Sequence, residues 1–335
     1  MSKTTAPKDY TSTLSLYETQ TAIGMIKRIF EDNLSSALNL KRVSAPLFVE
    51  PKTGLNDDLN GIERPVEFGI KETGGKAQIV HSLAKWKRMA LYKYGFSVGE
   101  GLYTDMNAVR RDEDMDNLHS IYVDQWDWEK VIDRSMRTVD TLKETVEKIV
   151  GAICETQQQL LSQYKDLTAT LSQDVCFVTT QELEDMYPEL SPKERENEYL
   201  QKHKTAFIMQ IGDLLSSGIK HDGRAPDYDD WKLNGDIVFW NELLGCAFEV
   251  SSMGIRVDET SLKEQLSKSG CENRLELPFH KDLLEGKLLL TMGGGIGQSR
   301  LSMLLLGKAH IGEVQVSVWD QTTISDCLAA GITLL

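Results

Sequence analysis

The sequence lacks several features that define whole classes of protein. Its 335 residues contain no apolar run approaching the roughly 18 residues that a membrane-crossing helix requires. The first residues, MSKTTAPKDYTSTLS, have no apolar core, so we expect no secretory signal among them. Collagen repeats and long coiled-coil heptads are also missing. We therefore expect a globular, cytoplasmic protein with no membrane partner.

Cysteine is scarce, and its five copies are not paired at CxxC spacing. An odd number of scattered cysteines indicates buried reduced thiols rather than a disulfide framework. The six histidines form no HExxH pattern, so zinc is not expected. The cysteines are Cys154, Cys176, Cys246, Cys271 and Cys327.

Basic residues are outnumbered. Lys plus Arg is 37 and Asp plus Glu is 51, which gives a formal net charge of −14. Proteins that bind nucleic acid need basic surfaces to displace counterions from phosphates, so we expect no nucleic-acid partner.

The order of apolar and polar residues predicts one catalytic domain over residues 16–335 after a flexible tail at residues 1–15. Apolar residues recur at helical spacing from Tyr17 to Leu38, and a second, longer helix is expected from about Trp128 to Tyr164. A strand at 43–49 is interrupted by Pro46, which places it at an edge or an interface. Later strands, ending with one at 314–318, come mostly in adjacent pairs. This order predicts an α+β fold with a mostly antiparallel sheet flanked by helices.

The densest chemical signal is TMGGGIGQSR at residues 291–300, followed by an apolar helix. Glycines such as Gly295 let a ligand approach the backbone closely, and Arg300 in the first helical turn indicates a nearby anion or nucleotide ring. The segment is neither a P-loop nor a dinucleotide-binding GxGxxG unit.

Further charged segments offer groups for phosphate, metal and carboxylate binding. The pair Arg110 and Arg111 precedes three acidic residues and could clamp a phosphate, or could be a solvated hairpin loop. On the next strand, period-two alternation puts Gln125 on the face opposite Trp126. Lys87, on a predicted helix at 82–94, suits a substrate carboxylate. The segment 221–231 is loop-like and could cover the site. Carboxylates and hydroxyls that could hold Mg²⁺ and a nucleotide are Asp236, Glu249, Ser251 and Ser252, with Arg256 beside them.

Together these segments resemble the three signature motifs of class II aminoacyl-tRNA synthetases. The strings HSLAKWKR, GEGLYT, VDQWDWE, RAPDYDDW, LNGDI, SSMGIRVD and GGGIGQSRL are more specific. They resemble the aspartate–ammonia ligase family and span roughly residues 43 to 310 in the family's order. The resemblance implies a class II synthetase-type catalytic domain and a homodimer.

The resemblance implies that L-aspartate, ammonia and ATP give L-asparagine, AMP and pyrophosphate through a β-aspartyl-adenylate, with Mg²⁺ present. Lys87, Gln125, Arg110 and Arg300 are then the expected catalytic residues. Aspartate would be bound by Ser82, Lys87, Gln125 and Asp127, with Asp124 and Asp227 as candidate bases for ammonium. Nucleotide contacts would come from Arg110, Asp236, Ser251, Ser252, Arg256, Gly295 and Arg300, and metal contacts from Glu249 and Asp236.

Two departures from the family pattern leave alternatives open. Thr53 stands where some members have an acid near the substrate amine, and Asp57 or Asp58 could replace it. Arg111 stands where a proline often follows the first arginine, so either arginine of the pair could contact phosphate.

Two other functions compete with the ligase. A synthetase that charges tRNA would need an RNA-binding surface, which the sequence does not indicate. A synthetase-like regulatory protein without turnover would have degenerate motif arginines, whereas Arg110, Arg256 and Arg300 are all present.

Overall fold

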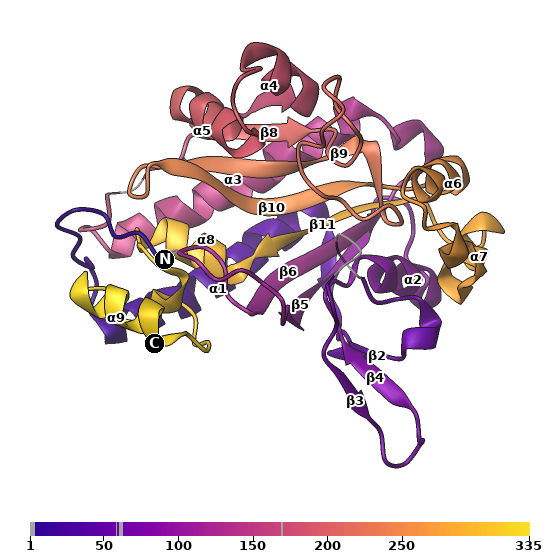
Figure 1. Ribbon diagram of the computed structural model, residues 1–335, viewed down its shortest axis with the longest axis horizontal. Helices are drawn as coiled ribbons and strands as arrows, with labels where there is room; N and C mark the ends of the chain where they lie inside the picture. Colours follow the sequence, from indigo (N-terminus) through magenta and orange to yellow (C-terminus); the bar gives the residue numbers. More distant parts are fainter. Residues whose placement is uncertain (1–3, 58, 60–62, 169) are drawn as a thin grey trace.

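The computed structural model describes residues 4–57, 59, 63–168 and 170–335, and an eight-stranded sheet lies at its centre (Figure 1). The strand order in this sheet is β1-β5-β6-β11-β10-β9-β8-β7, and a smaller sheet has the order β2-β4-β3. The strands are β1 (Leu40–Arg42), β2 (Phe48–Val49), β3 (Glu67–Gly69), β4 (Lys76–Ile79), β5 (Gly101–Val109), β6 (Tyr122–Val131), β7 (Cys176–Thr179), β8 (Thr205–Met209), β9 (Asp229–Asn241), β10 (Cys246–Arg256) and β11 (Thr291–Gly297).

Helices flank the large sheet. They are α1 (Leu16–Leu38), α2 (Ala84–Tyr94), α3 (Val139–Gln163), α4 (Thr180–Met186), α5 (Pro192–His203), α6 (Glu259–Lys268), α7 (Pro278–Leu284), α8 (Gln298–Leu305) and α9 (Gln321–Ala329). Short 3₁₀ turns are η1 (Pro51–Thr53), η2 (Arg134–Met136), η3 (Glu272–Glu276) and η4 (Ile311–Glu313). No helix in the described ranges is long and apolar enough to cross a membrane.

The large sheet is mixed, which corrects the expectation of a mostly antiparallel sheet within the α+β class. The neighbouring pairs from β5 to β8 are antiparallel, whereas the edge pairs β1–β5 and β7–β8 are parallel. A parallel pair needs a long crossover connection, and α4 and α5 supply one between β7 and β8. Sequence alternation identifies strands but not the direction in which an edge strand joins.

Helices α1 and α3 pack against each other and cover one face of the large sheet (Figure 1). Helix α1 begins with a capping box between Ser15 and Glu18, and Asn39 ends it in the left-handed conformation. Its buried residues follow the helical period, and Phe30 contacts the Trp126 ring of β6 at a centroid distance of 4.7 Å. The predicted N-terminal helix is therefore confirmed, and its apolar side leaves the opposite face of the sheet free for polar residues.

Other helices and the small sheet lie away from this packed face. A second apolar cluster joins α2 to residues of α6 and α7, and the small β2-β4-β3 sheet extends away from the body of the molecule (Figure 1).

Before α1, the Tyr10 hydroxyl donates to Glu313, and the Thr5 backbone N–H donates to Asn117 at 2.7 Å. The flexible tail and the single-domain boundary at residue 16 stay predictions.

The structure corrects three local expectations. The long helix begins at Val139, because Trp128 and the residues up to Val131 pair with β5 and β11 as part of β6. Residues 43–46 are not in a strand; β1 ends at Arg42, and β2 begins at Phe48. Residues 314–318 also form no strand.

All five cysteines are free, as expected, but Cys154 and Cys327 alone among them are buried.

Candidate active site

A polar pocket with a volume of about 360 Å³ lies on the face of the large sheet opposite α1 and α3. Its walls come from β6, β9, β10 and β11, the first turns of α2 and α8, the loop between β5 and β6, and the segment before β9. Of the residues that the sequence predicted, the pocket brings together Ser82, Lys87, Arg110, Asp124, Gln125, Asp127, Asp236, Glu249, Ser252, Arg256, Gly295 and Arg300.

The alternation of β6 separates the pocket from the core. Gln125 and Asp127 line the pocket, while Trp126 and Trp128 are fully buried in the apolar cluster with α1 and α3. This confirms the prediction that Gln125 lies on the face opposite Trp126. The strong burial of the two tryptophans fixes which side chains face the pocket, because a one-residue shift would reverse every side chain.

Lys87 is fully buried below the pocket, and oxygen atoms surround its ammonium group. Its Nζ donates to the Asp127 carboxylate, to the Trp128 carbonyl oxygen at 2.9 Å and to the Gly294 carbonyl oxygen at 3.0 Å. Burial lowers the pKa of Lys87, and Asp127 and Glu129 oppose this shift. The lysine thus ties α2 to β6 and β11 and balances the negative charge of Asp127.

Glycines in β11 let this network form. A side chain at Gly293 would overlap the Glu129 carboxylate, one at Gly294 would lie 2.6 Å from Met253 Cβ, and one at Gly295 would overlap the Gln125 amide. The glycine run predicted to bring a ligand close to the backbone therefore also accommodates protein groups from β6 and β10.

Arg256 and Glu129 form a charged layer under the pocket. Glu129 is fully buried and accepts hydrogen bonds from Arg256 Nη2 at 2.7 Å and from Thr291 Oγ1 at 2.7 Å. Arg256 also donates to Asp229. The pKa of Glu129 is lowered, because Arg256 outweighs the opposing effect of burial. Arg256 reaches the lining but already has carboxylate partners on two strands.

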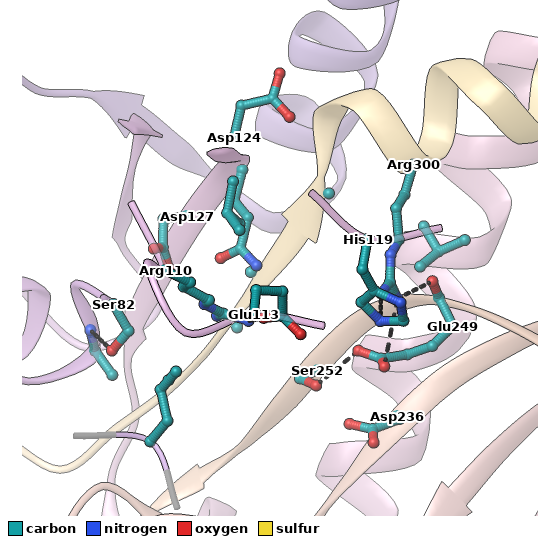
Figure 2. A pocket seen from close by; sticks show the side chains of 18 of the residues that line it. Ser82, Arg110, Glu113, His119, Asp124, Asp127, Asp236, Glu249, Ser252 and Arg300 are labelled. Atoms are coloured by element: carbon teal, nitrogen blue, oxygen red, sulfur yellow. Dashed lines mark hydrogen bonds and ion pairs between the residues drawn. The ribbon is translucent and has the colours of Figure 1, made fainter. Parts of the chain in front are cut away.

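The far wall of the pocket centres on Glu249. The Ser252 hydroxyl donates to Glu249 Oε1 at 3.1 Å, and Arg300 Nη1 donates to the Glu249 carbonyl oxygen at 3.0 Å (Figure 2). Glu249 and Ser252 are three residues apart and would face opposite sides of a regular strand. They share this wall because the β9–β10 pairing shifts register between Glu249 and Ser251. That bulge turns Ser251 away, and the described lining does not contain it.

The pKa values of the two expected metal ligands, Asp236 and Glu249, are shifted in opposite directions. Burial raises the pKa of Asp236 to about 7, Glu249 adds to the rise, and Arg224 opposes it. Burial would also raise the pKa of Glu249, but Arg300 and Arg224 outweigh it and lower the value to about 2. Arg224 Nη2 donates to Asp236 Oδ1 at 2.5 Å. Two carboxylates facing one pocket suit Mg²⁺, which takes few protein oxygens when substrate phosphates supply others. The described residues contain no group of three or more His, Cys, Asp or Glu side chains placed to hold a metal.

The paired arginines both reach the pocket. Arg110 lies 3.9 Å from Glu113 through Nη1, and its buried Nε makes no hydrogen bond within the described part of the chain. Arg111 also lines the pocket and is exposed. Both arginines of the pair therefore line the pocket, and the position of neither singles it out. Ser82 lines the pocket at the start of α2, with its hydroxyl 3.4 Å from the Ala84 backbone N–H.

Two carboxylates predicted to meet substrate have other surroundings. Asp124 touches the lining, but its Oδ1 accepts from the Ser299 backbone N–H at 3.1 Å and from Gln315 at 3.3 Å. Figure 2 shows this carboxylate pointing away from Asp127. These bonds hold the first turn of α8. Asp227 is not among the described residues that line this pocket; it lines a second, smaller cavity.

In that second cavity Asp227 is already paired. Its Oδ2 accepts from Lys85 at 3.0 Å, Arg274 at 3.1 Å and His280 at 3.0 Å. Burial alone would raise the pKa of the Asp227 carboxyl, but these neighbours, Lys85 above all, outweigh burial. The pKa therefore lies far below its usual range. Asp57 also lines this cavity. Thr53 lines neither cavity, and Asp58 lies outside the described residues.

Sequence reasoning missed several pocket residues. Arg224, Tyr228 and Asp229 lie in the RAPDYDDW string, so the signal was present without an assigned role. Glu129, which holds Arg256 under the pocket, ends the VDQWDWE string and was also assigned no role. His119 carried no signal of its own, because it lies in the loop after the paired arginines and meets Arg300 through the fold.

The fold is that of a known class of protein. The structure resembles the asparaginyl-tRNA synthetase of Entamoeba histolytica in complex with asparaginyl-adenylate, with a TM-score of 0.63 and 11% identity over 90% of this chain and 66% of that chain. The asparaginyl-tRNA synthetase of Pyrococcus horikoshii matches with a TM-score of 0.60 and 14% identity, covering 89% of this chain and 68% of that one. The chain thus has the catalytic fold of class II aminoacyl-tRNA synthetases.

More similar relatives define the family. The model of the aspartate–ammonia ligase family matches residues 17–331. The aspartate–ammonia ligase of Ruminiclostridium cellulolyticum is 62% identical over 98% of each chain, and that of Lactobacillus johnsonii is 59% identical over 98% of each chain. This chain belongs to the aspartate–ammonia ligase family.

Proposed function

We propose that this chain is an ATP-dependent ligase that converts L-aspartate and ammonia to L-asparagine, AMP and pyrophosphate. Its family supports the overall reaction. The observation that carries the proposal is one pocket with two chemically different ends. One end has the buried Lys87–Asp127 pair, and the other has Arg300 against Glu249. Such a pocket suits an amino acid at one end and a nucleotide at the other.

The chemistry follows from the poor leaving group of a free carboxylate. A β-carboxylate oxygen of aspartate attacks the α-phosphorus of ATP, and pyrophosphate leaves. The nitrogen of ammonia then attacks the carbonyl carbon of the adenylated β-carboxyl group, the bond from that carbon to the bridging oxygen breaks, and AMP leaves with that oxygen. The nitrogen releases one proton for each asparagine formed. This chemistry needs orientation and charge stabilisation more than a covalent enzyme intermediate.

We assign the aspartate end to Lys87, Gln125, Ser82 and Asp127. The Asp127 carboxylate supplies the negative charge that a substrate ammonium group requires, and Lys87 supplies compensating positive charge. Gln125 projects from the same face of β6 and offers both a donor and an acceptor. Buried polar groups of this kind discriminate strongly against analogues that lack a matching partner.

We assign the nucleotide end to Arg110, Arg300 and Gly295, with Ser252 and Asp236 beside them. The guanidinium groups stabilise negative charge on the phosphates, and Gly295 leaves room above β11. Glu249 and Asp236 would hold Mg²⁺, which neutralises phosphate charge when bound. The contacts of Asp124 and Asp227 described above argue against either as the base that accepts the ammonium proton.

We also propose that the protein is a homodimer. Apolar side chains near Pro46 support this proposal, since Leu47 and Phe48 are about half exposed and Phe68 lies beside Phe48 with a ring-centroid distance of 5.3 Å. Sedimentation equilibrium should give twice the mass of the chain; the mass of a single chain at micromolar concentration would contradict the dimer.

The function is tested by incubating the purified protein with Mg-ATP, aspartate and ammonium chloride and measuring AMP and asparagine together. Equal amounts of both products, each dependent on ammonium, are expected. ADP in place of AMP would contradict adenylation. Aspartate-dependent exchange of pyrophosphate into ATP, with transfer of aspartate to tRNA and no asparagine, would favour a tRNA synthetase instead.

A further inference from the structure

The loop between β5 and β6 carries a carboxylate–imidazole pair that no expected role explains. Asp116 Oδ1 accepts hydrogen bonds from the backbone N–H groups of Leu118 at 2.7 Å and His119 at 2.9 Å. The same oxygen lies 2.8 Å from His119 Nδ1. The pKa of Asp116 is lowered: burial would raise it, but the contact with His119 outweighs burial. Asp116 is therefore an ionised acceptor near neutral pH.

The opposite side of the same imidazole contacts the nucleotide end of the pocket. His119 Nε2 lies 2.6 Å from Arg300 Nη2, and Figure 2 shows the Arg300 side chain reaching between His119 and Glu249. A guanidinium nitrogen can only donate, and an ionised carboxylate can only accept. Both neighbours therefore require the same neutral tautomer, with hydrogen on Nδ1 and a lone pair on Nε2.

This tautomer fixes the second amino group of Arg300. Nη1 already donates to the Glu249 carbonyl oxygen, so His119 and β10 together restrain both ends of the guanidinium plane. Without a carboxylate at position 116, the imidazole could carry hydrogen on Nε2 and face Arg300 donor to donor. Arg300 would then lose one restraint before the nucleotide arrives.

We propose that Asp116 is a positioning residue that, through the tautomer of His119, holds Arg300 ready for the nucleotide. The proposal rests on the proposed function for the identity of the nucleotide, but its geometry does not involve the aspartate end of the pocket. Preorganising a charged group before binding removes an ordering cost from the binding step. Loss of this positioning should therefore weaken ATP binding selectively.

The test uses calorimetric binding of ATP to the full chain, together with the KM for each substrate. Asp116→Ala and His119→Leu should each weaken ATP binding about tenfold, the equivalent of one charged hydrogen bond. The KM for aspartate should stay within about twofold of that of the unaltered protein, since its site lies at the other end. His119→Gln and Asp116→Asn should keep most of the affinity, because each retains an acceptor oxygen.

Three controls separate positioning from a general structural effect. Asp133 accepts from the backbone N–H groups of Ser135 and Met136 in the same local pattern, away from the described pocket lining. Asp133→Ala should therefore leave ATP affinity unchanged. In a double-mutant cycle, Asp116→Ala should add nothing once His119 is Leu, because Asp116 acts through His119. Nitrogen-15 spectra should show an unprotonated His119 Nε2 in the unaltered protein and a protonated one in Asp116→Ala.

Equal weakening of ATP and aspartate binding in Asp116→Ala would overturn the proposal, as would additive effects in the cycle or an unchanged tautomer. Direct ATP binding also separates this proposal from the proposed function. A protein that makes no asparagine refutes the ligase, whereas the affinity and tautomer measurements still decide the role of Asp116.

Discussion

At the residue scale, buried charges of opposite sign pair with one another beneath the pocket. The pocket floor contains Lys87, Asp127, Glu129 and Arg256, each with at least one partner of opposite charge. Removing one member leaves its partner buried and uncompensated, which costs more than the pair contributes. A substitution of any one of the four is therefore expected to lower the stability of the fold.

Lys87 and Lys85 offer a matched test, because both are buried lysines of α2 paired with a carboxylate. Lys87→Ala should raise the KM for aspartate at least tenfold and that for ATP much less, since Lys87 reaches the aspartate end. Lys85→Ala should leave both values nearly unchanged, because Lys85 faces the second cavity. The measurement is steady-state kinetics with each substrate varied.

Stability provides the control for this comparison. Lys87→Ala should lower the free energy of unfolding by about 3 kcal/mol, and Lys85→Ala by less, because Arg274 still neutralises Asp227 and the His280 ring still contacts its carboxylate. Equal rises in the two KM values for Lys87→Ala would count against its assigned role.

Sequence predicts which residue types reach the site better than it predicts their partners. Twelve of the fourteen expected site residues line the pocket; Asp227 and Ser251 are not part of the described lining. Ser251 was misplaced because a bulge alters the alternation of β10, and no sequence rule locates that bulge. Asp227 was misplaced because its chain neighbour Tyr228 lines the pocket, whereas its own carboxylate reaches Lys85.

At the scale of elements, β11 determines how closely protein and ligand approach. Its three consecutive glycines lie between β6 and β10, and added side chains would meet different obstacles. At Gly295 the obstacle is the end of the Gln125 side chain, which can move. At Gly294 it includes the Ser252 carbonyl oxygen at 2.7 Å and Met253 Cβ, which cannot move without shifting β10.

We therefore expect Gly295→Ala to fold with nearly normal stability but to raise the KM for aspartate, because Gln125 is displaced. Gly294→Ala should instead lower the free energy of unfolding by about 1–3 kcal/mol through overpacking. Thermal unfolding and kinetics on both variants check this. A normal KM in a stable Gly295→Ala protein would show that Gln125 does not contact aspartate.

The turn η4 gives a pH-dependent prediction. Burial lowers the pKa of His310 from 6.5 to about 4, and its Nδ1 accepts from the Gly312 backbone N–H. A histidine with a lowered folded pKa stabilises the protein above pH 6.5 and loses that contribution as pH falls toward 4. The loss at pH 5 should be about 2 kcal/mol. His310→Asn keeps an acceptor without this titration.

Urea unfolding of the unaltered protein and His310→Asn at pH 7.5 and pH 5 checks the sign. The stability advantage of the unaltered protein should shrink by about 2 kcal/mol at the lower pH. A constant or growing advantage would mean that His310 is not held neutral.

The elements themselves were only partly predictable. The helix over α1 follows from its apolar spacing and is confirmed. The start of α3 was placed too early, because Trp128, Val131 and Ile132 fit a helical period as well as a strand, and pairing with β5 and β11 decides between them. The parallel edge pairs depend on chain crossovers, which local patterns do not encode.

At the scale of the whole molecule, the chain has a fold similar to that of aminoacyl-tRNA synthetases. Its net charge is −14. The fold alone does not choose between tRNA and ammonia as the acceptor of the activated acyl group. The family places ammonia in that role for the relatives, and the central claim for this chain is the β-aspartyl-adenylate that precedes the attack by ammonia.

The most direct test of this claim is oxygen transfer from aspartate labelled with ¹⁸O in its β-carboxylate. Because the attacking carboxylate oxygen stays with phosphorus when ammonia breaks the C–O bond, we expect one ¹⁸O in each AMP and the other in the asparagine amide. Mass spectrometry of both products decides the matter. Unlabelled AMP, or ¹⁸O in inorganic phosphate or pyrophosphate, would contradict the adenylate.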